Sequence, residues 1–229
     1  MPNANTMLDA ISTAAQQSGR TYITTNATVT INFLSDGTMN VTNTTTNTSH
    51  PTYGWTNHNM PIPSNGALFV TGGNARVMGT LKGKVTLGTD TNIYIGGNLL
   101  YNTDPRVHPE STDLMAMVSK NNVYIEDLGS SRPKNIEVDG YIVAMNQFLV
   151  QNFWTFAAGN LIQYGGLTTT LPGGLTGLFD PGSGQVIFGY NQLQYFDERL
   201  ESLAPLWFPP MMDSNNHKQK ENPVEAPHA

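Results

Sequence analysis

Short runs of alternating apolar and polar residues recur between glycines over residues 66–101. The apolar positions come in pairs, such as Leu68 with Val70 and Ile93 with Ile95. Alternation of this kind predicts strands with one buried face, and its return about every eight or nine residues favours a solenoid. We therefore expect Leu68, Val85 and Ile93 to point into one narrow core, and parallel strand pairs to outnumber antiparallel ones in this region.

Related phrases continue this pattern, beginning at Asn92, Asn122, Asn135 and Asn160. Their uneven spacing is typical of a β-helix with loop insertions. The predicted fold class is therefore all-β: a parallel β-helix (β-solenoid) of about five rungs, with a short N-terminal helix and β-hairpin and a disordered C-terminal tail. Three insertions rich in Pro, Gly or Ser should project as loops, at 102–112, 128–134 and 168–184.

The flanking segments divide the chain into three parts. Residues 6–19 predict a helix with Gly19 as its stop, and residues 21–33 and 39–41 predict a hairpin around Ser35-Asp36-Gly37. We assign 1–60 to the helix, the hairpin and a Thr/Asn-rich loop, and 61–210 to the solenoid. The apolar segment 191–210 should cover its last rung, and 211–229, which is almost free of apolar residues, should be a disordered tail.

Composition narrows the classes of partner. The 229 residues carry a formal net charge of −6 and only 12% charged residues, which disfavours nucleic acid as a partner. The chain has no cysteine, so disulfides and thiol catalysis are excluded, and this is compatible with an extracellular or cell-surface location. No run is long and apolar enough for a membrane span, so we expect no membrane insertion by this chain, and any targeting segment should precede Met1.

Several phrases, in order, resemble one known family. They are 60–70 (MPIPSNGALFV), 83–87 (GKVTL), 92–95 (NIYI), 104–106 (DPR), 113–123 (DLMAMVSKNNV), 144–148 (AMNQF), 189–190 (GY), 195–200 (YFDERL) and 208–209 (FP). Over about residues 21–210 the chain is similar to the β-solenoid region of bacterial PilX-like type IV pilus assembly proteins and their uncharacterised relatives. The resemblance implies a pilus-associated role with no catalytic residues, and relatives usually carry an N-terminal hydrophobic helix that is absent here.

Candidate chemistry is sparse. Glu137 and Asp139 alternate with apolar residues, so both should face solvent, and together with Asp180 they are the candidate ligands for calcium, the one cofactor that the sequence suggests. Five aromatic residues could stack on sugar rings if they are exposed: Tyr53, Trp55, Tyr94, Tyr124 and Trp154. Three of the five sit beside strands, so packing in the core or between rungs is the simpler interpretation. We keep Tyr53, Trp55 and Trp154 as the glycan-stacking candidates.

The sequence thus predicts a non-enzymatic, extracellular structural or adhesive β-solenoid, a pilus-associated or cell-surface filament component. Its partners would be other protein subunits, pilin-like or further copies of the chain, and a glycan is a further candidate ligand. The alternative is a carbohydrate-binding or polysaccharide-degrading β-helix, a lyase or hydrolase in which Glu137 and Asp139 act as acid and base. A third hypothesis is an ice- or surface-binding protein that uses the Thr-rich run at 42–49.

Overall fold

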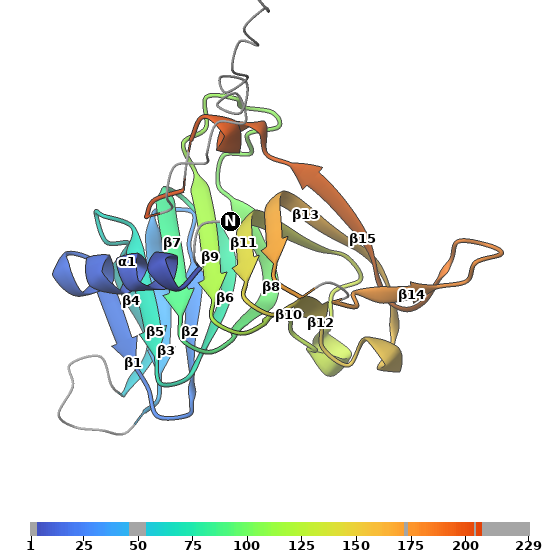
Figure 1. The fold of residues 1–229 in the computed structure, drawn as a ribbon, viewed down its shortest axis with the longest axis horizontal. Helices are drawn as coiled ribbons and strands as arrows, with labels where there is room; N and C mark the ends of the chain where they lie inside the picture. Colours follow the sequence, from blue (N-terminus) through green and yellow to red (C-terminus); the bar gives the residue numbers. More distant parts are fainter. Residues whose placement is uncertain (1–3, 46–53, 172–173, 204, 208–229) are drawn as a thin grey trace, which may run out of the picture.

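The computed structural model describes residues 4–45, 54–171, 174–203 and 205–207. Within them the protein is mostly β, with one N-terminal α-helix lying across a curled, mixed sheet of 15 strands (Figure 1). This confirms the predicted β-rich class and the N-terminal helix. None of the helices in these ranges is long and apolar enough to cross a membrane.

The elements follow in chain order. They are α1 (Ala4–Gln17), β1 (Arg20–Ile23), β2 (Thr28–Phe33), β3 (Thr38–Asn43), β4 (Trp55–Pro61), β5 (Ala67–Thr71), β6 (Asn74–Leu81), β7 (Lys84–Thr89), β8 (Ile93–Tyr101), β9 (Leu114–Ser119), β10 (Val123–Ile125), η1 (Gly129–Ser131), β11 (Ile136–Ala144), β12 (Phe148–Val150), η2 (Phe153–Thr155), β13 (Ala157–Thr169), β14 (Gly177–Phe179), β15 (Val186–Phe196) and η3 (Glu198–Glu201).

The helix α1 is amphipathic and covers the outer side of the sheet. Its apolar face, with Ile11 at its centre, packs on Phe69 of β5 and Val118 of β9. The helix begins two residues before the predicted start and ends at Gln17, and the N–H of Gly19 donates to the carbonyl of Ala14 at 3.0 Å. The predicted stop is therefore confirmed, because Gly19 caps a carbonyl of the last turn.

Three series of parallel pairs build the curl of the sheet. The first series joins β1, β5, β7 and β9 and continues into the second halves of β11 and β13. The second joins β2, β6, β8, β10 and β12. The third joins the ends of β6 and β8 to the first halves of β11 and β13, and then to β15. Among the described residues, every strand pairing of β5, β6, β7 and β8 is parallel, which confirms the prediction that parallel pairs outnumber antiparallel ones in residues 66–101.

Glycines allow single strands to pass from one series to the next. Gly140 of β11 and Gly165 of β13 lie opposite each other in the register, with φ of +150° and +140°. A Cβ on Gly165 would lie 2.1 Å from the carbonyl oxygen of Gly140. Side chains are therefore excluded at this bend, where the backbones of neighbouring strands approach closely.

One hydrophobic core lies inside the curl. Leu68, Val85 and Ile93 are all buried in it, as the alternating pattern predicted. They come from β5, β7 and β8, so the first and second series enclose the same core. Alternation along each strand directs these side chains inward and places their neighbours on the outer face of the sheet, part of which α1 covers.

The N-terminal hairpin is confirmed, but the predicted first strand of the hairpin is not continuous. β2 and β3 pair antiparallel, and Asp36 in the turn accepts the N–H of Thr38 at 2.9 Å. The predicted single strand over 21–33 is wrong: it divides into β1 and β2, which pair in the first and second series. Asn26, with φ of +54°, turns the chain between them.

The C-terminal part also differs from expectation. Residues 191–196 do not cover the last strand of the sheet but belong to it, as part of β15. The predicted loop at 168–184 contains the short strand β14, which pairs antiparallel with β15. The predicted tail at 211–229, and residues 46–49 of the Thr-rich run, lie outside the described residues.

Candidate functional site

A ladder of asparagine side chains sets the register of four neighbouring strands, β6, β8, β10 and β12. The amide of Asn92 donates to the side-chain oxygen of Asn74 at 3.2 Å. The backbone N–H of Asn122 donates to the side-chain oxygen of Asn92, and that of Gln147 to Asn122, both at 3.1 Å. Asn74 is the first residue of β6, and Asn92, Asn122 and Gln147 immediately precede β8, β10 and β12. The phrases that begin at Asn92 and Asn122 therefore stack on one another at the same corner.

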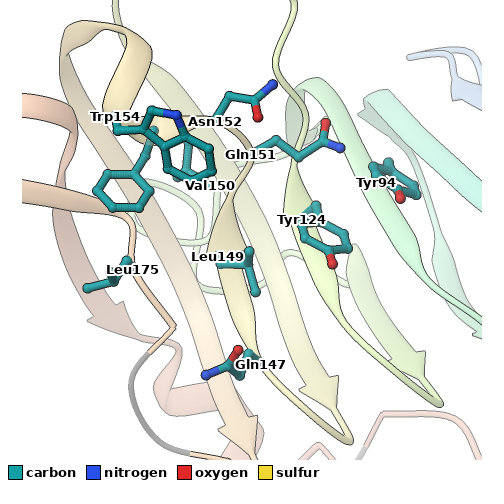
Figure 2. Close-up of a pocket in the computed structure, with 10 residues that line it drawn as sticks. Tyr94, Tyr124, Gln147, Leu149, Val150, Gln151, Asn152, Trp154 and Leu175 are labelled. Carbon is teal, nitrogen blue, oxygen red and sulfur yellow. The ribbon is translucent and has the colours of Figure 1, made fainter.

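This register aligns Tyr94, Tyr124 and Leu149 as a column of side chains across β8, β10 and β12 (Figure 2). The two tyrosine rings stack with their centroids 5.0 Å apart and their planes at 14°. Partial burial raises the pKa of Tyr94, and the neighbouring Tyr124 and Glu126 raise it further. The Tyr94 phenol is therefore a neutral hydrogen-bonding group at physiological pH.

The charged side chains beside this column form an ion pair with each other. Arg76, which lies opposite Tyr94 in the register of β6 and β8, forms an ion pair with Glu126 at 2.5 Å. The same guanidinium donates to the carbonyl of Gly96 at 3.3 Å. The tyrosine column is thus flanked by a compensated pair.

The chain after β12 forms the opposite side of the site. Asn152 adopts a left-handed conformation with φ of +49° and starts the 3-10 turn η2. This turn presents Trp154, whose side chain is 58% exposed and packs edge to face on Phe153 with centroids 5.3 Å apart. Figure 2 shows the Trp154 ring standing across the site from the tyrosines.

Asp127 anchors this turn from the neighbouring connection. Its carboxylate accepts the amide of Asn152 at 3.1 Å, and its backbone N–H donates to the side-chain oxygen of Gln151 at 3.2 Å. The N–H of Gly129, the guanidinium of Arg132 and the Asn152 amide all hold the pKa of Asp127 below its usual value. Asp127 therefore stays ionised and positions the two amides.

Together these residues line an open groove with a volume of ≈ 380 Å³. Its lining contains aromatic rings, aliphatic side chains and carboxamides, and none of the lining side chains is charged: Tyr94, Tyr124, Gln147, Leu149, Val150, Gln151, Asn152, Phe153, Trp154 and Leu175. Aromatic faces bind apolar C–H surfaces, while amides and phenols both donate and accept hydrogen bonds. This combination suits a ligand with apolar faces and many hydroxyl groups.

The predicted glycan-stacking residues are not brought together. Trp154 lies in the groove, whereas Trp55 begins β4, four pairings from β8 in the sheet order. The Trp55 ring stacks on His58 at 4.7 Å and packs edge to face on Tyr22 at 6.3 Å. Tyr53 lies outside the described residues.

Sequence reasoning named Tyr94 and Tyr124 among the aromatics that could stack on sugar but did not keep them as site residues, and it assigned no role to Gln151 and Asn152. Tyr94 and Tyr124 stack on each other between neighbouring strands, and the repeated Asn-x-Tyr phrase is the signal that could have paired them. The two amides carried no comparable signal, because their position depends on the turn after β12 and on Asp127.

The prediction that Glu137 and Asp139 both face solvent is wrong for Asp139. Asp139 is only 2% exposed, because the end of β8 and the connection from β8 to β9 cover this side of β11. One carboxyl oxygen of Asp139 accepts the N–H of Tyr101 at 2.8 Å, and the other has no partner among the described residues. Arg106 of the same connection donates to Glu137 at 2.6 Å.

Burial raises the pKa of Asp139 to about 7, and the nearby Glu137 acts in the same direction. The third predicted calcium ligand, Asp180, lies in the turn from β14 to β15, where its carboxylate accepts from Ser183 at 2.6 Å and Gly182 at 3.1 Å. In the described parts of the chain, no three His, Cys, Asp or Glu residues are grouped to hold a metal ion. Asp180 is therefore not grouped with Glu137 and Asp139, and calcium binding by either set stays a prediction.

Comparisons of the chain with family models, curated proteins and solved structures found no match in any of the three. The resemblance to PilX-like pilus assembly proteins stays a prediction, and the function is argued from the groove.

Proposed function

We propose that this protein is a non-enzymatic, adhesive β-solenoid that binds uncharged carbohydrate in the groove between β8, β10, β12 and η2. One observation carries the proposal: the exposed ring of Trp154 faces a tyrosine column across a groove whose lining side chains are all uncharged. Sugar rings combine apolar faces with hydroxyl groups, so they match both parts of this lining.

The shape of the groove supports a sugar chain as its ligand. Tyr94, Tyr124 and Leu149 lie on three adjacent strands, and neighbouring strands are about 4.8 Å apart. The column therefore offers contacts at regular intervals across the strands, and Trp154 and the amides of Gln151 and Asn152 stand at its end. A linear oligosaccharide lying across the strands would use all of these contacts.

The solenoid part of the proposal rests on the three parallel series. We take each passage of the chain through the first, second and third series as one rung, which gives about five rungs of the size typical for such repeats. A second ladder supports stacking of this kind: Asn135 accepts the N–H of Asn160 at 2.8 Å, and Asn160 accepts the amide of Asn191 at 3.1 Å. In this proposal the protein acts at the cell surface, where a cysteine-free β-solenoid does not depend on redox conditions.

Binding of immobilised neutral and acidic oligosaccharides, followed by titration calorimetry of the hits, tests the proposal. The expected result is binding of neutral oligosaccharides with an affinity that changes little between low and high salt, because no ion pair forms. Trp154→Ala should remove most of the affinity, because a sugar ring gains much of its contact from an exposed aromatic face.

The matched control is Val107→Ala, which shortens an exposed apolar side chain on the connection from β8 to β9, outside the groove. It should bind like the wild type. Failure of the wild type to bind any neutral glycan, or equal affinity in the Trp154→Ala variant, would show that the groove has another ligand.

Polysaccharide cleavage is the second candidate, and the carboxyl pair on β11 favours it. Asp139, with its pKa raised to about 7, lies near Glu137, and two acids in unlike environments are the arrangement of an acid and a base. A reducing-sugar assay decides between the two functions. Turnover that disappears in both Glu137→Gln and Asp139→Asn would establish an enzyme, whereas binding without turnover supports the adhesive function.

A further inference from the structure

The strand β15 has one open backbone edge. On one side it pairs with β13, and towards β13 the N–H of Gly189 donates to Phe156 at 2.7 Å and that of Asp197 to Gly165 at 3.2 Å. The N–H of Tyr190 points the other way and donates to Thr176 at 2.9 Å. Because N–H groups alternate in direction along a strand, those of Gln192, Gln194 and Phe196 point away from β13. No described strand pairs with them there.

This edge also lacks two common forms of protection against pairing. Edge strands are commonly blocked by charged residues or proline, but residues 186–196 contain neither. Large apolar side chains on β14 and β15 are exposed instead: Leu178, Phe179, Ile187, Phe188, Tyr195 and Phe196. Figure 1 shows β14 and β15 together at one end of the molecule.

The exposed apolar area approaches that of a specific interface. These six side chains are each between 37% and 53% exposed, and with roughly 150–250 Å² for a large side chain they present on the order of 500 Å² per copy. A standard interface buries about 800 Å² per partner, and the paired backbones would contribute further area.

We propose that β15 pairs antiparallel with β15 of a second copy of this chain, forming a two-fold dimer that continues the sheet. The absence of charge in 186–196 allows two copies to meet here although each carries a net charge of −6. A second copy of the chain presents the same unpaired N–H groups on the same uncharged strand, so each copy supplies the matching edge for the other. This inference does not depend on glycan binding.

Sedimentation velocity of the full chain over a wide concentration range tests the dimer. The wild type should sediment as two chains of 24.9 kDa each and dissociate on dilution. Tyr195→Lys should be monomeric, because the two-fold pairing brings two lysines onto one short edge. Phe196→Pro should also be monomeric, since it removes an edge N–H that has no partner among the described residues, and proline is tolerated on an edge.

The matched control is Val107→Lys, the same change from an exposed apolar residue to lysine at a position away from β15, and it should remain dimeric. Circular dichroism and thermal melting establish that each variant is folded. If one edge variant does not fold, the other decides, together with hydrogen exchange of the Gln192 and Gln194 amides, which should slow as the concentration rises. A wild type that is monomeric at every concentration, an open-ended polymer, or a folded edge variant that still dimerises would overturn the proposal.

Discussion

The ring of Tyr94 lies on the ring of Tyr124, with the two residues directly opposite each other in parallel strands and their centroids 5.0 Å apart. That separation is close to the spacing of neighbouring strands, so the stack is a direct consequence of the register. The asparagine ladder beside it sets the same register through Asn92 and Asn122. One repeated phrase of the sequence thus produces both a structural ladder and an aromatic surface.

We expect a measurable coupling between the two tyrosines. Stacked aromatic pairs contribute about 0.5–1.5 kcal/mol beyond the area they bury. A double-mutant cycle with Tyr94→Leu and Tyr124→Leu, followed by urea unfolding, should give a coupling energy in this range, because leucine keeps much of the apolar contact. Additive effects of the two substitutions would show that the rings do not stabilise each other.

Stability should fall as the pH rises from about 4 to about 7. The pKa of Asp139 is raised from 3.8 to about 7 in the folded protein, chiefly by burial, so the folded state binds this proton more tightly than the unfolded state does. The contribution is largest below the unfolded pKa and is lost as the pH passes through the folded one. The loss is on the order of 4 kcal/mol. Asp139→Asn should flatten the dependence of the melting temperature on pH in this interval.

The control for this substitution is Asp113→Asn. Both carboxylate oxygens of Asp113 accept backbone N–H groups, from Gly83 at 2.7 Å and Thr103 at 2.8 Å. An asparagine there must turn its amide towards one of these donors, so this variant should be less stable at every pH. If Asp139→Asn leaves the pH profile of the wild type unchanged, another group is responsible for it.

Gly165→Ala should destabilise the protein strongly. The substitution places a Cβ 2.1 Å from the carbonyl oxygen of Gly140 and imposes a φ of +140° on alanine. The backbone conformation alone costs about 1–3 kcal/mol, and the contact with the neighbouring strand adds to this. Gly184→Ala is the comparison, because Gly184 also has a positive φ, of +69°, but nothing lies within 4 Å of its Cβ position. Urea midpoints should therefore fall much further for Gly165→Ala than for Gly184→Ala.

The sequence predicted those elements that are determined by residues close together in the chain. Alternation placed Leu68, Val85 and Ile93 in the core, and a helical period followed by Gly19 placed α1. The break between β1 and β2 was missed, because the alternation continues across it while the pairing partner changes. Only Asn26 marked the turn, and a single asparagine is a weak signal.

The candidate site also combines features that the sequence predicts with features that only tertiary packing determines. Trp154 and the stacking of Tyr94 on Tyr124 were open to prediction, since exposed or repeated aromatics can be recognised in the chain itself. The burial of Asp139 could not be predicted, because Tyr101 at the end of β8 and Arg106 in the following connection reach β11 from more than thirty residues earlier in the chain. Sequence alternation describes which side of a strand a residue occupies, and it contains no information about what covers that side.

The sequence by itself determined a β-rich chain with an N-terminal helix, an alternating core and a repeated asparagine phrase, because these properties arise from residues close together in the chain. Only the tertiary structure decided that Trp154 stands opposite the tyrosine column, that Asp139 is buried, and that β15 has an open edge. These relationships depend on how separate turns of the chain stack and how their connections fold back, which is a property of the packed molecule.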